Sequence, residues 1–231
     1  MQDLSDFPIT RRWPAKDPSV IQLYSLPTPN GVKISIALEE MGLAYEPHLV
    51  NFATNDQMSP EFLSLNPNNK IPAIIDPNGP GGAPLPLFES GAILVYLAEK
   101  SGKLMPAAQR YEILQWVMFQ MGGLGPMFGQ LGFFHHFAGK EIEDPRPKER
   151  YRAEAARLLK VLDGALEGKD WLAGEYSIAD IAIGPWLNTL TGFYGAGEIV
   201  GFDALKNVPP YLARFLARPA VQRGLKIPAR D

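Results

Sequence analysis

The segment from Asn66 to Leu97 constrains the fold of this chain more than any other part of the sequence. A polar loop leads into Ile71-Pro72 and a β-branched run, a turn rich in glycine and proline follows, and Glu89-Ser90 then precedes an apolar stretch. The pattern predicts two strands joined by a turn and followed by a helix. Elements in that order can hold the main chain and the amino-acid end of a small peptide.

Pro72 is the first candidate contact for such a ligand. Proline is the only residue for which a cis peptide bond is cheap, about 0.5–1 kcal/mol above trans. A cis Ile71–Pro72 bond would turn the N–H and C=O groups of Ile71 outward, where a peptide could pair with them as an added strand does. The alternative is an ordinary proline at the start of a strand.

Glu89 and Ser90 form the second candidate contact. A serine at a helix N-terminus offers its hydroxyl and the first N–H groups of the helix to a carboxylate, and the glutamate beside it can accept an ammonium group. The α-amino-acid end of a peptide carries both of these charges close together. The alternative is a plain N-cap with no ligand.

The composition excludes several classes of protein. A chain of 231 residues with 46% hydrophobic residues can build a core in one large or two small domains. The net charge of -3 gives no sign of nucleic-acid or membrane binding, and the absence of cysteine excludes structural disulfides and Cys-x-x-Cys redox centres. The sequence begins with no secretory signal and has no apolar run long enough to cross a bilayer, so we expect a cytoplasmic protein.

Residues 20–101 alternate between strand and helix signals. Thr28-Pro29 has the cap-then-proline order of a helix start, and Gly42 marks the end of that helix. The other predicted elements are strands over Val20–Leu26, Tyr45–Phe52, Ala73–Asp76 and Leu85–Phe88, a short helix after Ser59 and a helix over Ser90–Lys100. A right-handed crossover should make the first two strands parallel, and the turn should make the last two antiparallel. The result is a mixed four-stranded sheet with helices on both faces, which is the thioredoxin-like layout.

The rest of the chain has a different character. Residues 1–19 have no clean period and are expected to form an extension, mobile or draped on the body, and residues 102–109 are expected to form a linker. Residues 110–231 show helical spacing and no convincing strand, so we expect an all-helical domain. Within it, Ser177 and Asp180 form a capping-box pattern before an apolar run.

Two patterns that resemble other kinds of site are weak. His135-His136 has no third ligand at a suitable spacing for a metal site, and Gly122-Gly123-Leu124-Gly125 lacks the ending of a phosphate-binding loop. We expect the glycines to allow close helix packing near Pro126. Neither a metal nor a nucleotide cofactor is therefore expected.

From about residue 20 to residue 225 the chain resembles the glutathione transferase family, which combines this sheet domain with Ile-Pro before the third strand, Glu-Ser before a helix, and a helical second half. A finer resemblance is to the nu class, which is associated with glutathione-dependent disulfide-bond oxidoreductase activity, and to the C-terminal region of a fungal prion-type nitrogen regulator. Four motifs carry it: Pro27-Thr28-Pro29-Asn30-Gly31, Asn66-Pro67-Asn68-Asn69-Lys70-Ile71-Pro72-Ala73-Ile74, Leu87-Phe88-Glu89-Ser90-Gly91-Ala92-Ile93-Leu94 and Gly122-Gly123-Leu124-Gly125-Pro126-Met127. The pair Ser177 and Asp180 resembles the family's buried capping motif, whose role is in folding.

The resemblance implies where glutathione binds. Its sulfur would lie by Thr28 and Asn30, whose donors can lower the pKa of a thiol, although Thr28 can also act simply as a helix cap. Tyr24 and Ser25 are the competing positions, because other classes use a tyrosine or serine near the end of the first strand. The remaining implied glutathione contacts are Gln57, Lys70, Ile71, Pro72, Glu89, Ser90 and Arg150, and a possible acceptor wall consists of Phe128, Phe133, Phe134 and Phe137.

Three functions follow as hypotheses. The first is disulfide reduction by a bound glutathione thiolate, with two glutathiones or one glutathione disulfide in the site. The second is conjugation of glutathione to a small electrophile, or reduction of a hydroperoxide. The third is a regulatory module that binds without catalysis. By resemblance the chain is also expected to form a homodimer.

Overall fold

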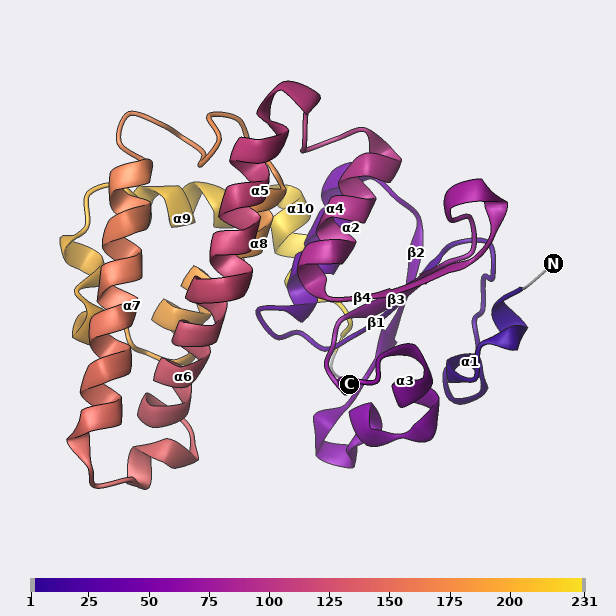
Figure 1. The fold of residues 1–231 in the computed structure, drawn as a ribbon, viewed down its shortest axis with the longest axis horizontal. Coiled ribbons are helices and arrows are strands. Elements are labelled where there is room, and N and C mark those ends of the chain that lie inside the picture. The colour runs from indigo at the N-terminus through magenta and orange to yellow at the C-terminus, as the bar shows by residue number, and fades with distance from the viewer. Residues whose placement is uncertain (1–2, 230–231) are drawn as a thin grey trace. The chain divides into compact units, whose positions relative to one another are not determined.

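The computed structural model describes residues 3–229, which form two compact units. The first unit contains the residues up to Lys103 together with those from Pro219 onward, and the second contains Leu104–Arg218 (Figure 1). The expected helical domain reached residue 231, whereas the structure groups the segment after Pro219 with the first unit.

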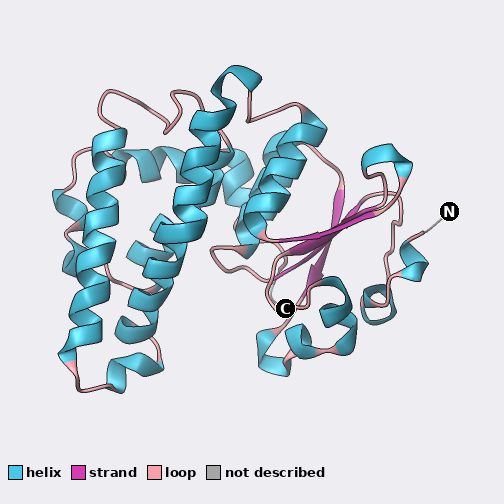
Figure 2. Cartoon of the chain, in the orientation of Figure 1, coloured by secondary structure: helices cyan, strands magenta, loops and turns pink. Residues whose placement is uncertain are grey.

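A four-stranded sheet forms the centre of the first unit (Figure 2). Its strand order is β2-β1-β3-β4; β1 and β2 are parallel, and the other two pairs are antiparallel. Every residue of β1 and β3 is buried, as expected for central strands with both faces covered. The strand bounds are β1 Ile21–Ser25, β2 Tyr45–Leu49, β3 Ala73–Asp76 and β4 Leu85–Phe88. The predicted mixed sheet and thioredoxin-like layout are confirmed.

Helices cover both faces of this sheet. Helices α2 and α4 pack against each other on one face, and α1 and α3 pack together on the other (Figure 1). Ser59 caps α3 as predicted, by accepting a hydrogen bond from the N–H of Phe62, and α2 ends at Gly42 in the left-handed conformation. The helix bounds are α1 Ile9–Arg12, α2 Gly31–Met41, α3 Pro60–Leu65, α4 Ser90–Ser101 and α10 Pro219–Gly224.

Helix α10 joins the first unit through α2. The hydroxyl of Ser35 donates to the carbonyl of Gly224 at 2.7 Å, and a Cβ on Gly224 would lie 2.7 Å from the Cα of Ile36. The two helices therefore approach more closely than any larger residue at position 224 would allow.

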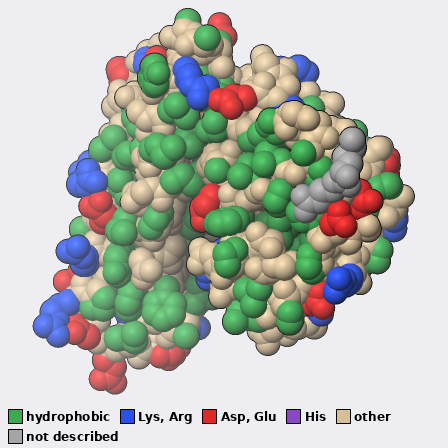
Figure 3. Space-filling model, turned by 45° about the vertical axis from the view of Figure 1, so that its right-hand side comes forward, with side chains coloured by type: hydrophobic (Ala, Val, Ile, Leu, Met, Phe, Trp, Pro, Cys, Tyr) green, Lys and Arg blue, Asp and Glu red, His purple; other side chains and the backbone are tan. Residues whose placement is uncertain are grey.

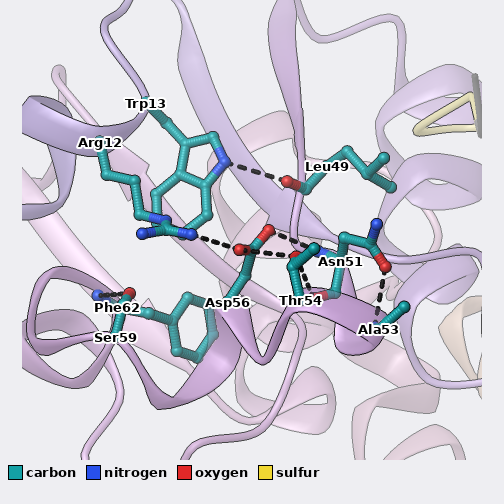
Figure 4. A network of polar contacts seen from close by, with 9 residues as sticks. All are labelled: Arg12, Trp13, Leu49, Asn51, Ala53, Thr54, Asp56, Ser59 and Phe62. Carbon is teal, nitrogen blue, oxygen red and sulfur yellow. Dashed lines mark hydrogen bonds and ion pairs between the residues drawn. The ribbon is translucent and has the colours of Figure 1, made fainter.

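The expected N-terminal extension is draped on the first unit and contributes Leu4 and Ile9 to its core. Leu4 and Ile9 are buried in the hydrophobic cluster that contains Tyr24 and Phe62. The indole N–H of Trp13 donates to the carbonyl of Leu49 at 2.9 Å (Figure 4). The segment is too short for a recognisable period, so the sequence did not reveal this burial.

Arg12 also anchors the loop that follows β2. Its guanidinium forms an ion pair with Asp56, whose carboxylate accepts the N–H of Asn51 at 2.9 Å and the hydroxyl of Thr54 at 3.0 Å (Figure 4). The arginine and these hydrogen bonds hold the pKa of Asp56 below its ordinary value, although burial acts in the opposite direction.

The second unit is built from helices, as predicted, with one isolated β-bridge between Ala173 and Glu175 (Figure 2). A π-helical segment, Gln120–Leu124, joins its first two helices. A Cβ on Gly125 would lie 3.3 Å from the ring of Trp186, as expected for close helix packing, whereas a Cβ on Gly122 would meet nothing within 4 Å. The helix bounds are α5 Arg110–Phe119, α6 Gly125–His135, α7 Pro145–Ala165, α8 Ile178–Asn188 and α9 Val208–Ala217.

The predicted capping box opens α8. The Ser177 side chain accepts the N–H of Ala179, and the carboxylate of Asp180 accepts the N–H of Ser177 at 2.8 Å. Asp180 is fully buried, and its carboxylate also accepts the N–H of Leu172 and the hydroxyl of Tyr211. Among residues 3–229, no helix is both long enough and apolar enough to cross a membrane.

Candidate functional site

A cavity of about 140 Å³ in the first unit brings three loops together. The loops precede α2, β3 and α4, and the cavity is lined by Asn30, Asn66, Lys70, Ile71, Pro72, Glu89 and Ser90. All of these except Asn66 are residues that the sequence analysis assigned to the site. The cavity is thus built where the two candidate contacts for a peptide meet.

The loop before β3 presents Ile71 and Pro72, and their peptide bond is cis. Asn66 shapes this loop, because its amide donates to the carbonyl of Lys70 at 2.6 Å and its side-chain oxygen accepts the N–H of Asn68 at 3.0 Å. An Asn that closes its own turn is a recognisable sequence signal, but the role of Asn66 in the cavity wall was missed.

Glu89 and Ser90 lie where β4 gives way to α4. Ser90 is the first residue of the helix and is 5% exposed, and Glu89 occupies the cap position with φ 73° and ψ 112°. Positive φ is disfavoured for a residue with a side chain, and such conformations occur often at functional sites. Glu89 is exposed, and both Glu89 and Ser90 line the cavity.

The turn before α2 confirms part of the prediction. Helix α2 is regular from Gly31, later than expected, so Pro29 does not occupy the first helical position. Thr28 nevertheless makes the expected capping contacts, since its hydroxyl accepts the N–H of Gly31 at 3.2 Å and its carbonyl accepts the N–H of Val32. A Cβ on Gly31 would lie 1.9 Å from the carbonyl oxygen of Leu26, so this turn requires glycine. Asn30 lines the cavity, whereas Thr28 is not among its lining residues.

Lys33 lies under this turn and was missed by the sequence analysis. Its side chain is fully buried, and its ammonium donates to Oδ1 of Asn30 at 2.8 Å and to the hydroxyl oxygen of Ser90 at 3.3 Å. Burial lowers the pKa of Lys33 well below its ordinary value, and the negative charge of Glu89 opposes that effect. A lysine within an apolar helix face is the only sequence signal that could have suggested it.

Tyr24 and Ser25, the competing positions for the sulfur, are not at the cavity. Tyr24 is fully buried in the core, where its ring stacks on His48 with centroids 4.8 Å apart. Burial raises the pKa of Tyr24 well above its ordinary value. Ser25 is also buried, and its hydroxyl faces the carbonyl of Leu26.

Gln57 lies in the loop that Arg12 and Asp56 anchor, outside the cavity lining. Its side-chain Oε1 is buried and finds no hydrogen-bond partner in the described part of the chain. The carboxylate of Asp56, the residue before Gln57, accepts the N–H of Asn51 and so holds the start of this loop.

The remaining predicted residues belong to the second unit. Arg150 is exposed on α7. Phe128 is fully buried, and its ring lies in the helical core rather than on the surface. Phe133 and Phe137 are 42% and 45% exposed, and Phe134 is half-buried against Tyr151. Figure 3 shows that hydrophobic side chains occupy much of the visible face of this unit.

A second cavity, of about 200 Å³, lies beside Phe134 and His135 between α6 and α7. It is lined by Leu131, Phe134, His135, Lys148, Glu149, Arg152 and Ile199. Within the described range, 3–229, no group of three or more His, Cys, Asp or Glu side chains could hold a metal ion.

Known protein domains match this chain in both of its units. The glutathione S-transferase N-terminal domain matches residues 19–99, and the glutathione S-transferase C-terminal domain matches residues 126–219. The disulfide-bond oxidoreductase YfcG of Escherichia coli (strain K12) is 47% identical over 210 residues, covering 89% of this chain and 94% of that protein.

Two solved structures are similar over almost the whole chain. A glutathione transferase from Pseudomonas putida, with one glutathione disulfide bound per subunit, has a TM-score of 0.98 and 68% identity, covering 99% of this chain and 100% of that one. A glutathione transferase from Burkholderia graminis, with two glutathione molecules bound per subunit, has a TM-score of 0.98 and 69% identity, covering 100% of this chain and 98% of that one.

The matched N-terminal range contains the whole of the smaller cavity, and the matched C-terminal range contains most of the helical unit. The sheet topology, the cavity and these similarities agree, and the chain therefore belongs to the glutathione S-transferase family.

Proposed function

We propose that this chain is a glutathione-dependent disulfide-bond oxidoreductase of the nu class. The observation that carries the proposal is that one cavity is lined by Asn30, by Ile71 and by the pair Glu89 and Ser90. These groups match a thiol, a peptide backbone and an amino-acid end, which are the parts of glutathione. The similarity to the oxidoreductase YfcG supports the same reaction.

Glutathione lies across this cavity with its γ-glutamyl end at Glu89 and Ser90 and its thiol by Thr28 and Asn30. The cavity of about 140 Å³ is smaller than the roughly 300–1,000 Å³ of typical ligand pockets, so part of the tripeptide extends beyond it. Lys70 and Gln57 are assigned to the glycine carboxylate, because that group needs donors.

The sulfur chemistry is supplied by the ligands, since the chain has no cysteine. A bound glutathione thiolate attacks a disulfide, forming a mixed disulfide and releasing one thiolate, which takes up a proton. A second glutathione thiolate attacks the glutathione sulfur of that mixed disulfide, giving glutathione disulfide and the second thiol. Two glutathiones are oxidised for each disulfide reduced, and the site accommodates two glutathiones or their disulfide.

The protein's part is to bind, orient and activate the thiol. The hydroxyl of Thr28 and the amide of Asn30 can donate to the sulfur at the start of α2, where the helix dipole also favours negative charge. Lowering the thiol pKa raises the thiolate fraction that attacks.

The direct test is reduction of 2-hydroxyethyl disulfide by the purified full chain, coupled to glutathione reductase. We expect turnover that requires glutathione. An inactive protein whose melting temperature rises with millimolar glutathione would replace this function with a non-catalytic binding module. An inactive protein with no such rise would also exclude a glutathione site.

Thr28 and Ser90 are expected to differ in their effects on the kinetics. Thr28→Ala should lower kcat about tenfold with a smaller effect on affinity, whereas Ser90→Ala should weaken glutathione binding about tenfold, because each removes one hydrogen bond. Steady-state kinetics and calorimetric titration separate the two effects. A loss of kcat without a loss of affinity in Ser90→Ala would contradict its assignment to the γ-glutamyl end.

Glu89 allows backbone strain to be separated from ligand binding. Glu89→Gly and Glu89→Ala both remove the carboxylate, so both should weaken glutathione binding to a similar degree. Only glycine relieves the positive φ, so Glu89→Gly should be more stable than Glu89→Ala by about 1 kcal/mol. Denaturant unfolding measures the difference, and equal stabilities would show that the backbone at this position is not strained.

Glutathione conjugation or peroxide reduction is the second candidate. The exposed rings of Phe133 and Phe137 favour it, since an apolar wall can bind an aromatic electrophile. High activity with a chlorinated aromatic substrate and none with disulfides would select it. In either case we propose a cytoplasmic homodimer.

A further inference from the structure

Lys33 is the most unusual polar residue of the first unit. It is fully buried on α2, and lysine is among the residues least often found in that state unless it is paired. Burying an ammonium group is costly, so hydrogen bonds must offset much of the cost. The groups that accept hydrogen bonds from Lys33 indicate its role.

Both partners line the glutathione cavity. The ammonium donates to Oδ1 of Asn30 at 2.8 Å and to Oγ of Ser90 at 3.3 Å, and Ser90 lies 57 residues further along the chain. Asn30 is assigned to the thiol end of the ligand and Ser90 to its γ-glutamyl end. A single buried cation therefore contacts both ends of the site from beneath it.

The structure gives these hydrogen bonds a direction. Nζ of Lys33 donates to Oδ1 of Asn30, and a protonated lysine has donors and no acceptor. The amide nitrogen of Asn30 then lies on the other side of the planar group. Oγ of Ser90 likewise accepts a hydrogen bond from Lys33. The hydroxyl hydrogen of Ser90 therefore points away from Lys33 and donates elsewhere.

The hydrogen bonds at the start of α2 support this orientation of the Asn30 side chain. An asparagine at a helix N-cap usually accepts an N–H of the first turn on its side-chain oxygen. Asn30 has helical backbone angles, φ -80° and ψ -38°, and makes no such hydrogen bond, while Thr28 accepts the N–H of Gly31. The side chain of Asn30 is therefore not used for capping and is engaged by Lys33.

We propose that Lys33 is a positioning residue that directs the amide N–H of Asn30 and the hydroxyl of Ser90 toward glutathione. The inference rests on the proposed function, because it assigns those donors to the thiolate and the γ-glutamyl carboxylate. Lys33 itself does not touch the ligand in this scheme. Without it, the side chain of Asn30 can rotate and present its oxygen to the sulfur.

The test is a double-mutant cycle with Lys33→Met, Asn30→Ala and the double variant in the full-length protein. Methionine keeps the length and apolar stem of lysine and removes the donor. Lys33→Met should lower kcat/KM for 2-hydroxyethyl disulfide about tenfold and raise the pKa of the bound glutathione thiol by about one, the size of one lost hydrogen bond. Ultraviolet thiolate absorbance measures that pKa. In the Asn30→Ala background the effect of Lys33→Met on the thiol pKa should disappear.

Lys226→Met is the matched control, since it removes the same charge from an exposed position of the same unit. It should leave the thiol pKa and kcat unchanged. Active wild-type protein with unchanged kinetics and thiol pKa in Lys33→Met would overturn the inference while leaving the proposed function intact. An inactive wild-type protein would instead reject the proposed function.

A second measurement needs no variant and covers the case in which Lys33→Met does not fold. Neutron diffraction of the wild-type protein with glutathione distinguishes the nitrogen of Asn30 from its oxygen. The nitrogen should face the glutathione sulfur. An oxygen in that position would overturn the inference regardless of the kinetics.

Discussion

Asn30→Ala is expected to lower kcat for disulfide reduction about a hundredfold, the lower end of what is lost when one preorganised donor to a developing negative charge is removed. Asn30 is the only side chain of the turn before α2 that lines the cavity in the described part of the chain, and Lys33 holds its oxygen away from the ligand. The amide N–H of Asn30 should stabilise the thiolate more than the bound thiol, so KM for glutathione should change much less than kcat. Steady-state kinetics and the pKa of the bound thiol measure the two effects.

Asn30→Asp separates the donor from simple packing. Aspartate keeps the shape of the side chain and an oxygen for Lys33, but it replaces the N–H donor with negative charge. It should therefore raise the thiol pKa at least as far as Asn30→Ala does. Asn78→Ala, at an exposed turn of the same unit, is the control and should leave kcat unchanged. Wild-type kinetics in Asn30→Asp would contradict the assigned role.

The strands and caps were predictable because their signals are local. The β-branched run after Pro72, the glycine-rich turn and the apolar stretch after Ser90 give β3, β4 and α4 within a residue of the structure. Capping at Ser59 and Ser177 was equally local, since the partners lie within three residues. The cavity residues followed from the same segment, together with the family resemblance.

The features that were missed depend on contacts between distant residues. Lys33 meets Ser90 across 57 residues, and nothing in the neighbourhood of either residue announces the pair. Leu4 and Ile9 join the core only because the sheet and α3 provide a surface for them. Phe128 looked like part of an aromatic cluster, but the helical packing decided which rings are exposed.

Asp180→Ala is expected to destabilise the second unit by about 3–5 kcal/mol, because it leaves several buried donors without an acceptor. Those donors are the N–H of Leu172, the N–H and hydroxyl of Ser177, and the hydroxyl of Tyr211. Trp171 lies 5.8 Å from Tyr211 between ring centroids, so its fluorescence reports on this region during denaturant unfolding. A loss below about 1 kcal/mol would show that water replaces the carboxylate.

A comparison of Asp144→Asn with Asp180→Asn tests whether burial determines how much stability is lost with the carboxylate. Asp144 caps α7 at a partly exposed position, and asparagine caps a helix about as well as aspartate, so Asp144→Asn should change the free energy of unfolding by less than about 0.5 kcal/mol. In Asp180→Asn an amide N–H group must face N–H and O–H donors in a buried site. That variant should therefore lose most of the stability that Asp180→Ala loses.

The pH dependence of the Asp180→Asn effect has a definite sign. Burial raises the pKa of Asp180 to about 6 from its ordinary value of 3.8, although its four hydrogen bonds lower it. The folded state then holds the proton more tightly than the unfolded state, so this contribution to stability is fully present below the ordinary value and is lost as pH rises through 6. Asparagine does not titrate, and the stability gap between wild type and Asp180→Asn should narrow by roughly 1 kcal/mol between about pH 5 and pH 7.5. A gap that widens over this range would mean that the hydrogen bonds outweigh burial and that the carboxylate is the stable form in the folded protein.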